Sequence, residues 1–257
     1  VYSGAAMTIL SWERLSVDRR EVPAALTIGS FDGIHRGHQE LIRRISVEPR
    51  RLSVVVTFRR NPAWYLRREH YPGDIMSLEQ RLEVFRELGI DYVILLDFGS
   101  DIRGLRGERF LEALRERFHV ELVVVGYDFH FGRNRETSAT ALRRLAGGLG
   151  IRVDIVDPLI DNERSISSTR IRECIAAGDV QTAWRLLSRP YTLDVRNGTP
   201  GLVGDSEQVL PAEGSYRVSL RTPNGQREGT VTITGQALHW AADTSDAIET
   251  EFLAPLM

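Results

Sequence analysis

The sequence of 257 residues contains no lysine, so all 33 of its basic residues are arginines. A Walker A phosphate-binding loop needs a lysine, and Schiff-base catalysis needs an amine, so both are excluded. Genomic base composition explains such a bias, but the chemical exclusion holds whatever its cause. Positive charge offered to a ligand must therefore come from arginine, protonated histidine, a helix N-terminus or a metal ion.

Cysteine and long apolar runs are also scarce. The single cysteine, Cys174, excludes an internal disulfide framework and is typical of a reducing compartment, so we expect a cytoplasmic protein. No apolar run is long enough to cross a bilayer, and the start, V-Y-S-G-A-A-M, lacks the pattern of a secretory signal. Two alternatives stay open for residues 1–6: native sequence, or sequence upstream of a natural start at Met7. The net charge of −2 predicts no general attraction to nucleic acid or to an anionic membrane, and nothing in the sequence indicates a protein partner.

Residues 24–157 alternate short runs rich in Val and Ile with stretches of helical periodicity. Runs without polar alternation are typical of parallel strands that are covered on both faces. The pattern predicts a doubly wound α/β sheet, Rossmann-like in class. The expected strands are Ala25–Ile28, Leu52–Phe58, Tyr92–Leu96, Leu122–Val125 and Arg152–Val156; the expected helices are Gln39–Ile45, Leu78–Leu88, Glu108–Phe118, Ala139–Leu149, Ser168–Ala177 and Val180–Leu187.

The texture changes after Arg189-Pro190. Short β-type runs follow at 215–220, 229–234, 237–240 and 248–253, and Asn224-Gly225 is a strong hairpin signal between the first two. We therefore predict an α/β domain over residues 1–189 and a small β-rich domain over 190–257, which is marginal in size for a core of its own.

The stretch Gly29–His38 reads G-S-F-D-G-I-H-R-G-H and joins the first predicted strand to the first predicted helix. Backbone N–H groups and the helix dipole attract anions at such a junction, and its glycines let a ligand approach the backbone. The pattern therefore favours phosphate binding, with a nucleotide as the ligand. Alternatives are two of the ligands of a metal site, or histidines without a function.

Three further segments carry polar or aromatic signals. In Ser165–Arg172 (S-I-S-S-T-R-I-R), Ser168 and Thr169 are candidate helix N-caps and the arginines bring charge, which indicates a second anion site; an ordinary cap is the alternative. Gly126–Gly132 (G-Y-D-F-H-F-G) ends a strand with aromatic residues around an acid, suited to a planar ring, although Phe129 and Phe131 also suit a core. Thr57–Pro62 (T-F-R-R-N-P) is a weaker signal that turn formation alone explains.

Together these motifs resemble the adenylyltransferase module of the bacterial bifunctional riboflavin kinase/FAD synthetase family. The resemblance covers about residues 20–192 in one order and spacing, and includes a closing run, G-D-V-Q-T-A-W-R-L-L-S-R-P-Y at 178–191. It implies a nucleotidyltransferase fold and the transfer of AMP from ATP to FMN, giving FAD and pyrophosphate, with a phosphate-bound Mg²⁺ and no metal-binding side chains.

The resemblance also implies roles for particular residues. His35 and His38 would hold the ATP phosphates, and Ser168, Thr169 and Arg172 would bind the departing pyrophosphate. The remaining positions implied to bind ATP or flavin are Gly29, Ser30, Phe31, Asp32, Gly37, Thr57, Phe58, Asn61, Pro62, Gly126, Asp128, Phe129 and Ser167.

The chain departs from the family pattern at several places. Ser30 stands where the family usually has Asn, Asn61 stands where His is frequent, and the loop after Gly132 lacks a further Gly. The C-terminal part is too short for the family's kinase barrel and has no P-T-A-N signature, so Glu249, a match to the kinase's catalytic acid, has no phosphate site beside it. We therefore expect no riboflavin kinase activity. Two other readings stay open: an H-x-G-H nucleotidyltransferase with another acceptor, and a non-catalytic flavin- or nucleotide-binding protein.

Overall fold

The computed structural model describes residues 7–256 apart from 16–17, 49, 133–134, 196–207, 236 and 242–246. The described chain falls into two compact units. The first unit comprises residues 1–31, 37–66 and 82–159, and the second comprises residues 32–36, 67–81 and 160–257. The division at 189/190 that the sequence suggests differs from this grouping and stays a prediction about domain limits.

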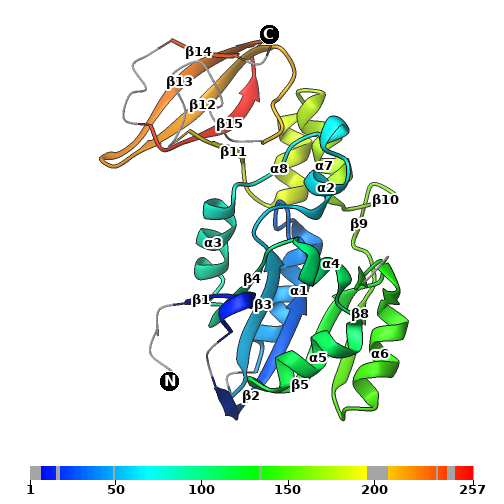
Figure 1. Ribbon diagram of the computed structural model, residues 1–257. Helices are drawn as coiled ribbons and strands as arrows, with labels where there is room; N and C mark the ends of the chain where they lie inside the picture. Colours follow the sequence, from blue (N-terminus) through cyan, green and yellow to red (C-terminus); the bar gives the residue numbers. More distant parts are fainter. Residues whose placement is uncertain are drawn as a thin grey trace. The chain divides into compact units, whose positions relative to one another are not determined.

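The first unit is built on a sheet of six parallel strands (Figure 1). The sheet order is β1-β4-β3-β2-β5-β8. The strands are β1 (Thr8–Ser11), β2 (Arg19–Ile28), β3 (Leu52–Phe58), β4 (Tyr92–Leu96), β5 (Phe118–Gly126) and β8 (Arg152–Val156). The helices whose residues belong wholly or mainly to this unit are α1 (Arg36–Ser46), α2 (Pro62–Leu66), α3 (Leu78–Glu87), α4 (Ser100–Gly104), α5 (Gly107–Arg115) and α6 (Ala139–Gly147), with a 3-10 turn at Trp12–Arg14 and a short hairpin of β6 (His130–Phe131) and β7 (Thr137–Ser138).

Side chains fill both faces of this sheet because successive residues of a strand point to opposite sides. Alternate residues such as Leu26, Val54 and Ile94 join a core that includes Phe110 and Leu142 of α5 and α6. Their neighbours in the strands are buried as well, as the burial of the middle of β3 shows. Burial on both sides explains why the strands read as continuous apolar runs, and it confirms the predicted parallel α/β class.

The strand order reverses between β2 and β5. From β2 the chain continues to β3 and β4 on one side of the sheet, whereas β5 and β8 lie on the other side. In open α/β sheets, ligands bind outside the carboxyl ends of the strands at such a switch point. The first motif follows β2 and the aromatic motif follows β5, so the topology brings both to this edge.

The second unit contains a five-stranded antiparallel sheet of order β11-β15-β12-β13-β14, together with two helices and a small hairpin. The hairpin is β9 (Ile160–Asp161) with β10 (Arg164–Ser165), the helices are α7 (Ser168–Ala176) and α8 (Val180–Leu187), a 3-10 turn covers Arg68–His70, and the strands are β11 (Tyr191–Asp194), β12 (Gly214–Thr222), β13 (Gly225–Thr234), β14 (Ala237–Trp240) and β15 (Glu249–Pro255). The expected β-rich C-terminal part is confirmed.

Two local expectations need correction. Residue Phe118 is not helical: α5 ends at Arg115, and Phe118 begins β5 and is fully buried. The hairpin signal is right about the turn but one residue late, because Thr222 pairs with Gly225 and the turn is Pro223-Asn224.

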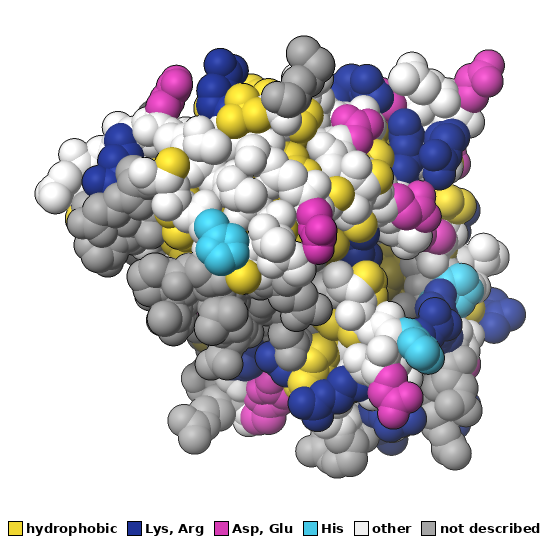
Figure 2. All heavy atoms as spheres, turned by 90° about the horizontal axis from the view of Figure 1, so that it is seen from above, with side chains coloured by type: hydrophobic (Ala, Val, Ile, Leu, Met, Phe, Trp, Pro, Cys, Tyr) yellow, Lys and Arg dark blue, Asp and Glu magenta, His cyan; other side chains and the backbone are white. Residues whose placement is uncertain are grey.

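The described surface mixes charges of both signs. On the face that Figure 2 displays, arginine and carboxylate side chains are interspersed among the described residues, in keeping with the small net charge. Among the described helices, none combines the length and apolar character needed to cross a membrane.

Gly33 offers a test of how tightly the first motif is packed. A Cβ atom there would lie 3.1 Å from two carbon atoms of Ile75 and 3.2 Å from Leu187, and its φ is +83°. Gly89 has a similar φ of +72° with nothing within 4 Å, which makes it a matched control. We expect Gly89→Ala to lower the free energy of unfolding by about 1–2 kcal/mol for the left-handed backbone. Gly33→Ala should cost about 1–3 kcal/mol more because of overpacking. Urea denaturation measures both, and equal losses would contradict the packing argument.

Candidate active site

Three loops of the first unit meet at the carboxyl edge of its sheet. The Gly29 N–H donates to the carbonyl of Val56 at 3.1 Å, and the Thr57 hydroxyl donates to the carbonyl of Ser30 at 3.1 Å. The pairing of Thr27 with Val124 places the ends of β2 and β5 side by side, so Gly126 lies close to the loop after β2. The predicted residues that follow β2, β3 and β5 are therefore brought together.

The loop after β2 has an unusual backbone. Phe31 and Ile34 have positive φ values of 50° and 36°, which residues with a side chain rarely adopt, and Gly33 between them is also left-handed. Phe31 is fully buried, with its ring 5.8 Å from that of Phe85 and 5.2 Å from that of His38. Phe31 thus anchors the loop and orients His38 through an edge contact, a role distinct from the ligand contact implied by resemblance.

In the motifs Gly126–Gly132 and Thr57–Pro62, some residues support the fold and others are accessible to a ligand. Phe131 is a core residue, with its ring centroid 4.2 Å from that of Phe110. Phe129 is half-buried against the same core, and Asp128 is exposed. Asn61 caps α2, since its Oδ1 accepts from the Ala63 N–H at 3.0 Å, with Pro62 at the first helical position. Helix initiation accounts for Asn61-Pro62 without a ligand.

In the second unit, the buried carboxylate of Asp32 holds together the parts of the two phosphate-binding motifs that belong to this unit. Its Oδ1 accepts from the N–H groups of Ile75 at 2.9 Å and Met76 at 3.2 Å, and its Oδ2 is ion-paired with Arg172. Its backbone carbonyl accepts from the Ser168 hydroxyl at 2.8 Å. Burial raises the pKa of Asp32 to about 6 against the opposing effect of Arg172, so at neutral pH the pair is ionised. Asp32 therefore supports the site from within.

Ser167, not Ser168 or Thr169, is the N-cap of α7, because its side chain accepts from the Arg170 N–H at 3.3 Å. Ser168 is the first helical residue, and its hydroxyl hydrogen is directed at Asp32. Thr169 is exposed. The backbone N–H groups of a first helical turn lack partners within the helix, so together with Thr169 they suit an anion. Arg172 also donates to the Gly73 carbonyl at 2.8 Å, which fixes the direction of its charge.

His35 is almost fully buried, with 6% of its surface exposed. Burial, reinforced by the positive charges of Arg189 and Arg172, lowers the pKa of His35 to about 4. His35 is therefore neutral at physiological pH and meets a ligand as a hydrogen-bonding imidazole. Sequence reasoning located this histidine but had no means of finding its charge state.

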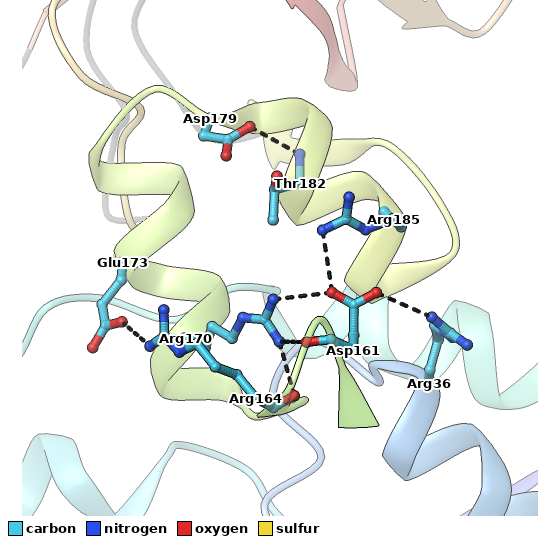
Figure 3. Close-up of polar contacts among 8 residues, drawn as sticks. All are labelled: Arg36, Asp161, Arg164, Arg170, Glu173, Asp179, Thr182 and Arg185. Carbon is cyan, nitrogen blue, oxygen red and sulfur yellow. Dashed lines mark hydrogen bonds and ion pairs between the residues drawn. The ribbon is translucent and has the colours of Figure 1, made fainter. Parts of the chain in front are cut away.

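A carboxylate that the sequence did not single out, Asp161, binds arginines from three segments of the second unit (Figure 3). Its Oδ2 accepts from Arg170 of α7 at 2.9 Å and from Arg185 of α8 at 3.1 Å, and its Oδ1 lies 3.9 Å from Arg36 at the start of α1. Burial alone would raise the pKa of Asp161, but the hydrogen bonds from Arg170 and Arg185 outweigh it and lower that pKa. Figure 3 shows these guanidinium groups converging on the Asp161 side chain. The contacts fix the β9–β10 hairpin against α7, the helix that begins in the S-S-T-R-I-R motif.

The described residues contain no group of three or more His, Cys, Asp or Glu side chains placed to hold a metal ion. The donors that do gather near His35 are guanidinium groups, hydroxyls and N–H groups, which suit phosphate oxygens. A Mg²⁺ ion fits this set only as one carried by a ligand's phosphates, which is how Mg²⁺ commonly binds.

Comparison with known proteins identifies the family of this chain. A sequence model described as FAD synthetase matches residues 18–170. The chain belongs to the FAD synthetase family. An FAD synthetase of Listeria monocytogenes is 30% identical over 217 residues, covering 82% of this chain and 87% of the relative. A bifunctional riboflavin kinase/FMN adenylyltransferase of Haemophilus influenzae is 30% identical, covering 79% of this chain and 70% of the relative. One from Buchnera aphidicola is 28% identical, covering 79% of this chain and 66% of the relative, so the chain spans slightly less than two thirds of it.

A solved structure from Streptococcus pneumoniae, described as a macrolide-efflux protein, has a TM-score of 0.78. It is 24% identical and covers 97% of this chain and 100% of its own. At this identity the likeness shows a shared fold. The shared fold includes the C-terminal sheet, because the match covers nearly the whole chain.

The neutral state of His35 predicts how stability depends on pH. An unfolded chain binds a proton at His35 below about pH 6.5, whereas the folded chain does so only near its lowered pKa. Stability from this group is therefore lost as the pH falls from 6.5 towards 4, by about 2 kcal/mol between pH 7 and pH 5. His35→Gln, which does not titrate, should lose less stability over that interval than the wild type in urea denaturation at the two pH values.

Asp32 acts in the opposite direction, since its raised pKa favours the folded state as the pH falls through 6. Both proteins in the comparison contain Asp32, so its effect is common to them. Equal losses in wild type and His35→Gln would show that His35 is not held neutral by the fold.

Proposed function

We propose that this protein is an FMN adenylyltransferase, which transfers the AMP part of ATP to the phosphate of FMN and releases FAD and pyrophosphate. The observation that carries this proposal is the intact pair of family motifs, G-I-H-R-G-H and S-S-T-R-I-R, built around the buried Asp32. Membership of the FAD synthetase family, and the names of the relatives, support this choice of acceptor.

The reaction needs no protein nucleophile. An oxygen of the FMN phosphate attacks the α-phosphorus of ATP in line, the new P–O bond forms, and the bond to the β-phosphate oxygen breaks. Catalysis is then positioning together with stabilisation of developing negative charge. His35 and His38 would donate hydrogen bonds to the α-phosphate oxygens. The neutral state of His35 means that it contributes a directed N–H group and not a full charge.

The pyrophosphate would be received by the first turn of α7. Its N–H groups, the exposed Thr169 hydroxyl and the oriented guanidinium of Arg172 are the donors. Mg²⁺ carried by the β- and γ-phosphates would neutralise part of their charge. Because Ser168 donates to Asp32, its contribution would be to hold the loop at the helix start.

The flavin would be bound by the edge residues of the first unit, Phe58, Asp128 and Phe129, which the structure brings to the ends of β3 and β5. These aromatic side chains suit a planar ring system. Asn61 and Pro62 act indirectly in this proposal, by starting α2.

We also propose that riboflavin kinase activity is absent and that the protein acts in the cytoplasm. Glu249, the one match to the kinase's acid, is buried and ion-paired with Arg221, so its carboxylate is engaged by a cation. The Listeria relative, which is of similar extent and is named only as an FAD synthetase, supports the first proposal.

Product analysis distinguishes these possibilities. The protein is incubated with ATP and Mg²⁺, once with FMN and once with riboflavin, and the flavins are separated by chromatography. We expect FAD from FMN and no FMN from riboflavin. FMN formed from riboflavin would refute the absence of kinase activity. No FAD would refute the main proposal and favour another acceptor or a non-catalytic role.

His38 provides a mutational test. His38→Ala should lower kcat about 10²–10³-fold, the usual effect of losing one preorganised donor to a developing negative charge. His119→Ala is the matched control, since its side chain is 52% exposed at the far end of β5. Steady-state kinetics with ATP and FMN measure both variants, and a near-normal kcat in His38→Ala would remove that residue from the site.

A further inference from the structure

Arg189 binds the backbone of residues 32–36, the loop that contains His35 and is called the histidine loop below. The two lie far apart in the sequence. Its guanidinium donates to the carbonyl of Gly33 and, at 3.3 Å, to the carbonyl of Ile34. A further bond of 3.3 Å reaches the carbonyl of Leu187 at the end of α8. The left-handed Ser188, with φ of 62°, ends that helix and reverses the chain just before Arg189. One side chain thus ties the end of α8 to the two residues that precede His35.

The two carbonyls belong to the most constrained part of the loop. Gly33 and Ile34 both have positive φ, and Ile34 is fully buried. A residue with a branched side chain at positive φ is an outlier that persists only where surrounding contacts impose it. Buried carbonyl groups also require donors, and Arg189 supplies them from a rigid planar fork.

The same guanidinium contributes to the electrostatics of His35. The charged groups that surround this loop are Asp32 within it, Arg172 on α7, Asp74 and Arg81 on the segment that pairs with Asp32, and Arg189 itself. Arg189 and Arg172 both disfavour a proton on His35. Arg189 therefore affects both the place and the charge of the imidazole.

We propose that Arg189 is a positioning residue for adenylyl transfer, which holds the His35 loop in its working conformation by binding the carbonyl groups of Gly33 and Ile34. The inference rests on the proposed function and deepens it. It extends the adenylyltransferase machinery to the connection between α8 and β11, where the resemblance includes the run 178–191 but gave no residue a role.

Two substitutions separate the geometric and electrostatic parts of this role. Arg189→Lys keeps the positive charge but loses the planar fork, so it cannot donate to both carbonyls in the same way. Arg189→Gln keeps a donor but loses the charge. Arg217→Gln is the matched control, because Arg217 is an exposed arginine of β12 in the same unit.

The first measurement is steady-state kinetics with ATP and FMN. We expect Arg189→Lys to lower kcat at least tenfold while KM for ATP changes less than threefold, because the loop's alignment changes more than its phosphate-binding groups do. Arg217→Gln should stay within twofold of the wild type. A kcat for Arg189→Lys within twofold of wild type would overturn the proposal, as would an equal loss in Arg217→Gln.

The second measurement follows the His35 ring by NMR titration between pH 5 and pH 8. The chain has six histidines, and the His35→Gln variant assigns the signal. We expect the His35 signals to begin to shift at a higher pH in Arg189→Gln than in the wild type or Arg189→Lys, because only that variant loses the charge. Burial, the larger cause, still lowers the pKa of His35 in all three proteins. If Arg189 served only to stabilise the fold, Arg189→Lys and Arg189→Gln would not differ in this way. His35 titrating alike in all three proteins would overturn the electrostatic part.

The same experiments keep the two proposals distinguishable. Wild-type protein that makes FAD, beside Arg189 variants with unchanged kinetics, overturns the positioning role alone. Wild-type protein that makes no FAD from FMN overturns the proposed function, and the positioning role with it.

Discussion

The candidate site depends on the hydrogen bonds and the ion pair of the buried Asp32 carboxylate. It accepts from two backbone N–H groups of the 75–76 segment, pairs with Arg172 of α7 and, through its carbonyl, fixes Ser168. Removing one partner of a buried ion pair leaves an uncompensated charge, which is strongly destabilising. Such a centre favours one arrangement of the histidine loop and the motif helix over all others.

Because the chain has no lysine, the cationic side chains in this arrangement are arginines. Arg170, Arg172 and Arg189 each bind backbone carbonyl groups, and two of them also bind a carboxylate. A planar fork serves two acceptors at once, which an ammonium group does less well. The arginines of this protein therefore act as structural connectors as well as sources of charge, and the phosphate-binding role assigned to arginine from the sequence covers only part of what they do.

Local sequence patterns predicted most of the fold. The bounds of β3, β4, β8, α8 and β14 agree with expectation, because each has a strong period or clear end signals. The edge strands β1 and β11 were missed. Each pairs with a strand distant in the sequence, β4 and β15 respectively, whereas the equally short β14 pairs with the strand that directly precedes it. Phe118 was placed in a helix because its apolar side chain continues the helical period, whereas its burial in the sheet depends on pairing with residues a hundred positions earlier.

The loops that carry the predicted site residues after β2, β3 and β5 lie at one edge of the sheet, and the roles of these residues stay predictions. The sequence did not show that Ser167 caps α7, that Phe31 is an anchor, or that His35 is neutral. Asp161 and Arg189 were not singled out either. The Ser167 cap is local and competes with two equally suitable neighbours, Ser168 and Thr169. The other features depend on partners distant in the sequence, which no local period records.

The long separations also matter for synthesis of the chain. The partners of the 32–36 loop include Ser168, 136 residues downstream of Asp32, and Arg189, 156 residues downstream of Gly33. At translation rates of about 5–20 residues per second, this delay is roughly ten to thirty seconds. On the ribosome, β2 and β3 are available to form a sheet while the loop between them still lacks its supports. The supported conformation of the histidine loop is thus among the last features of the molecule to form, although it belongs to one of the first segments to be made.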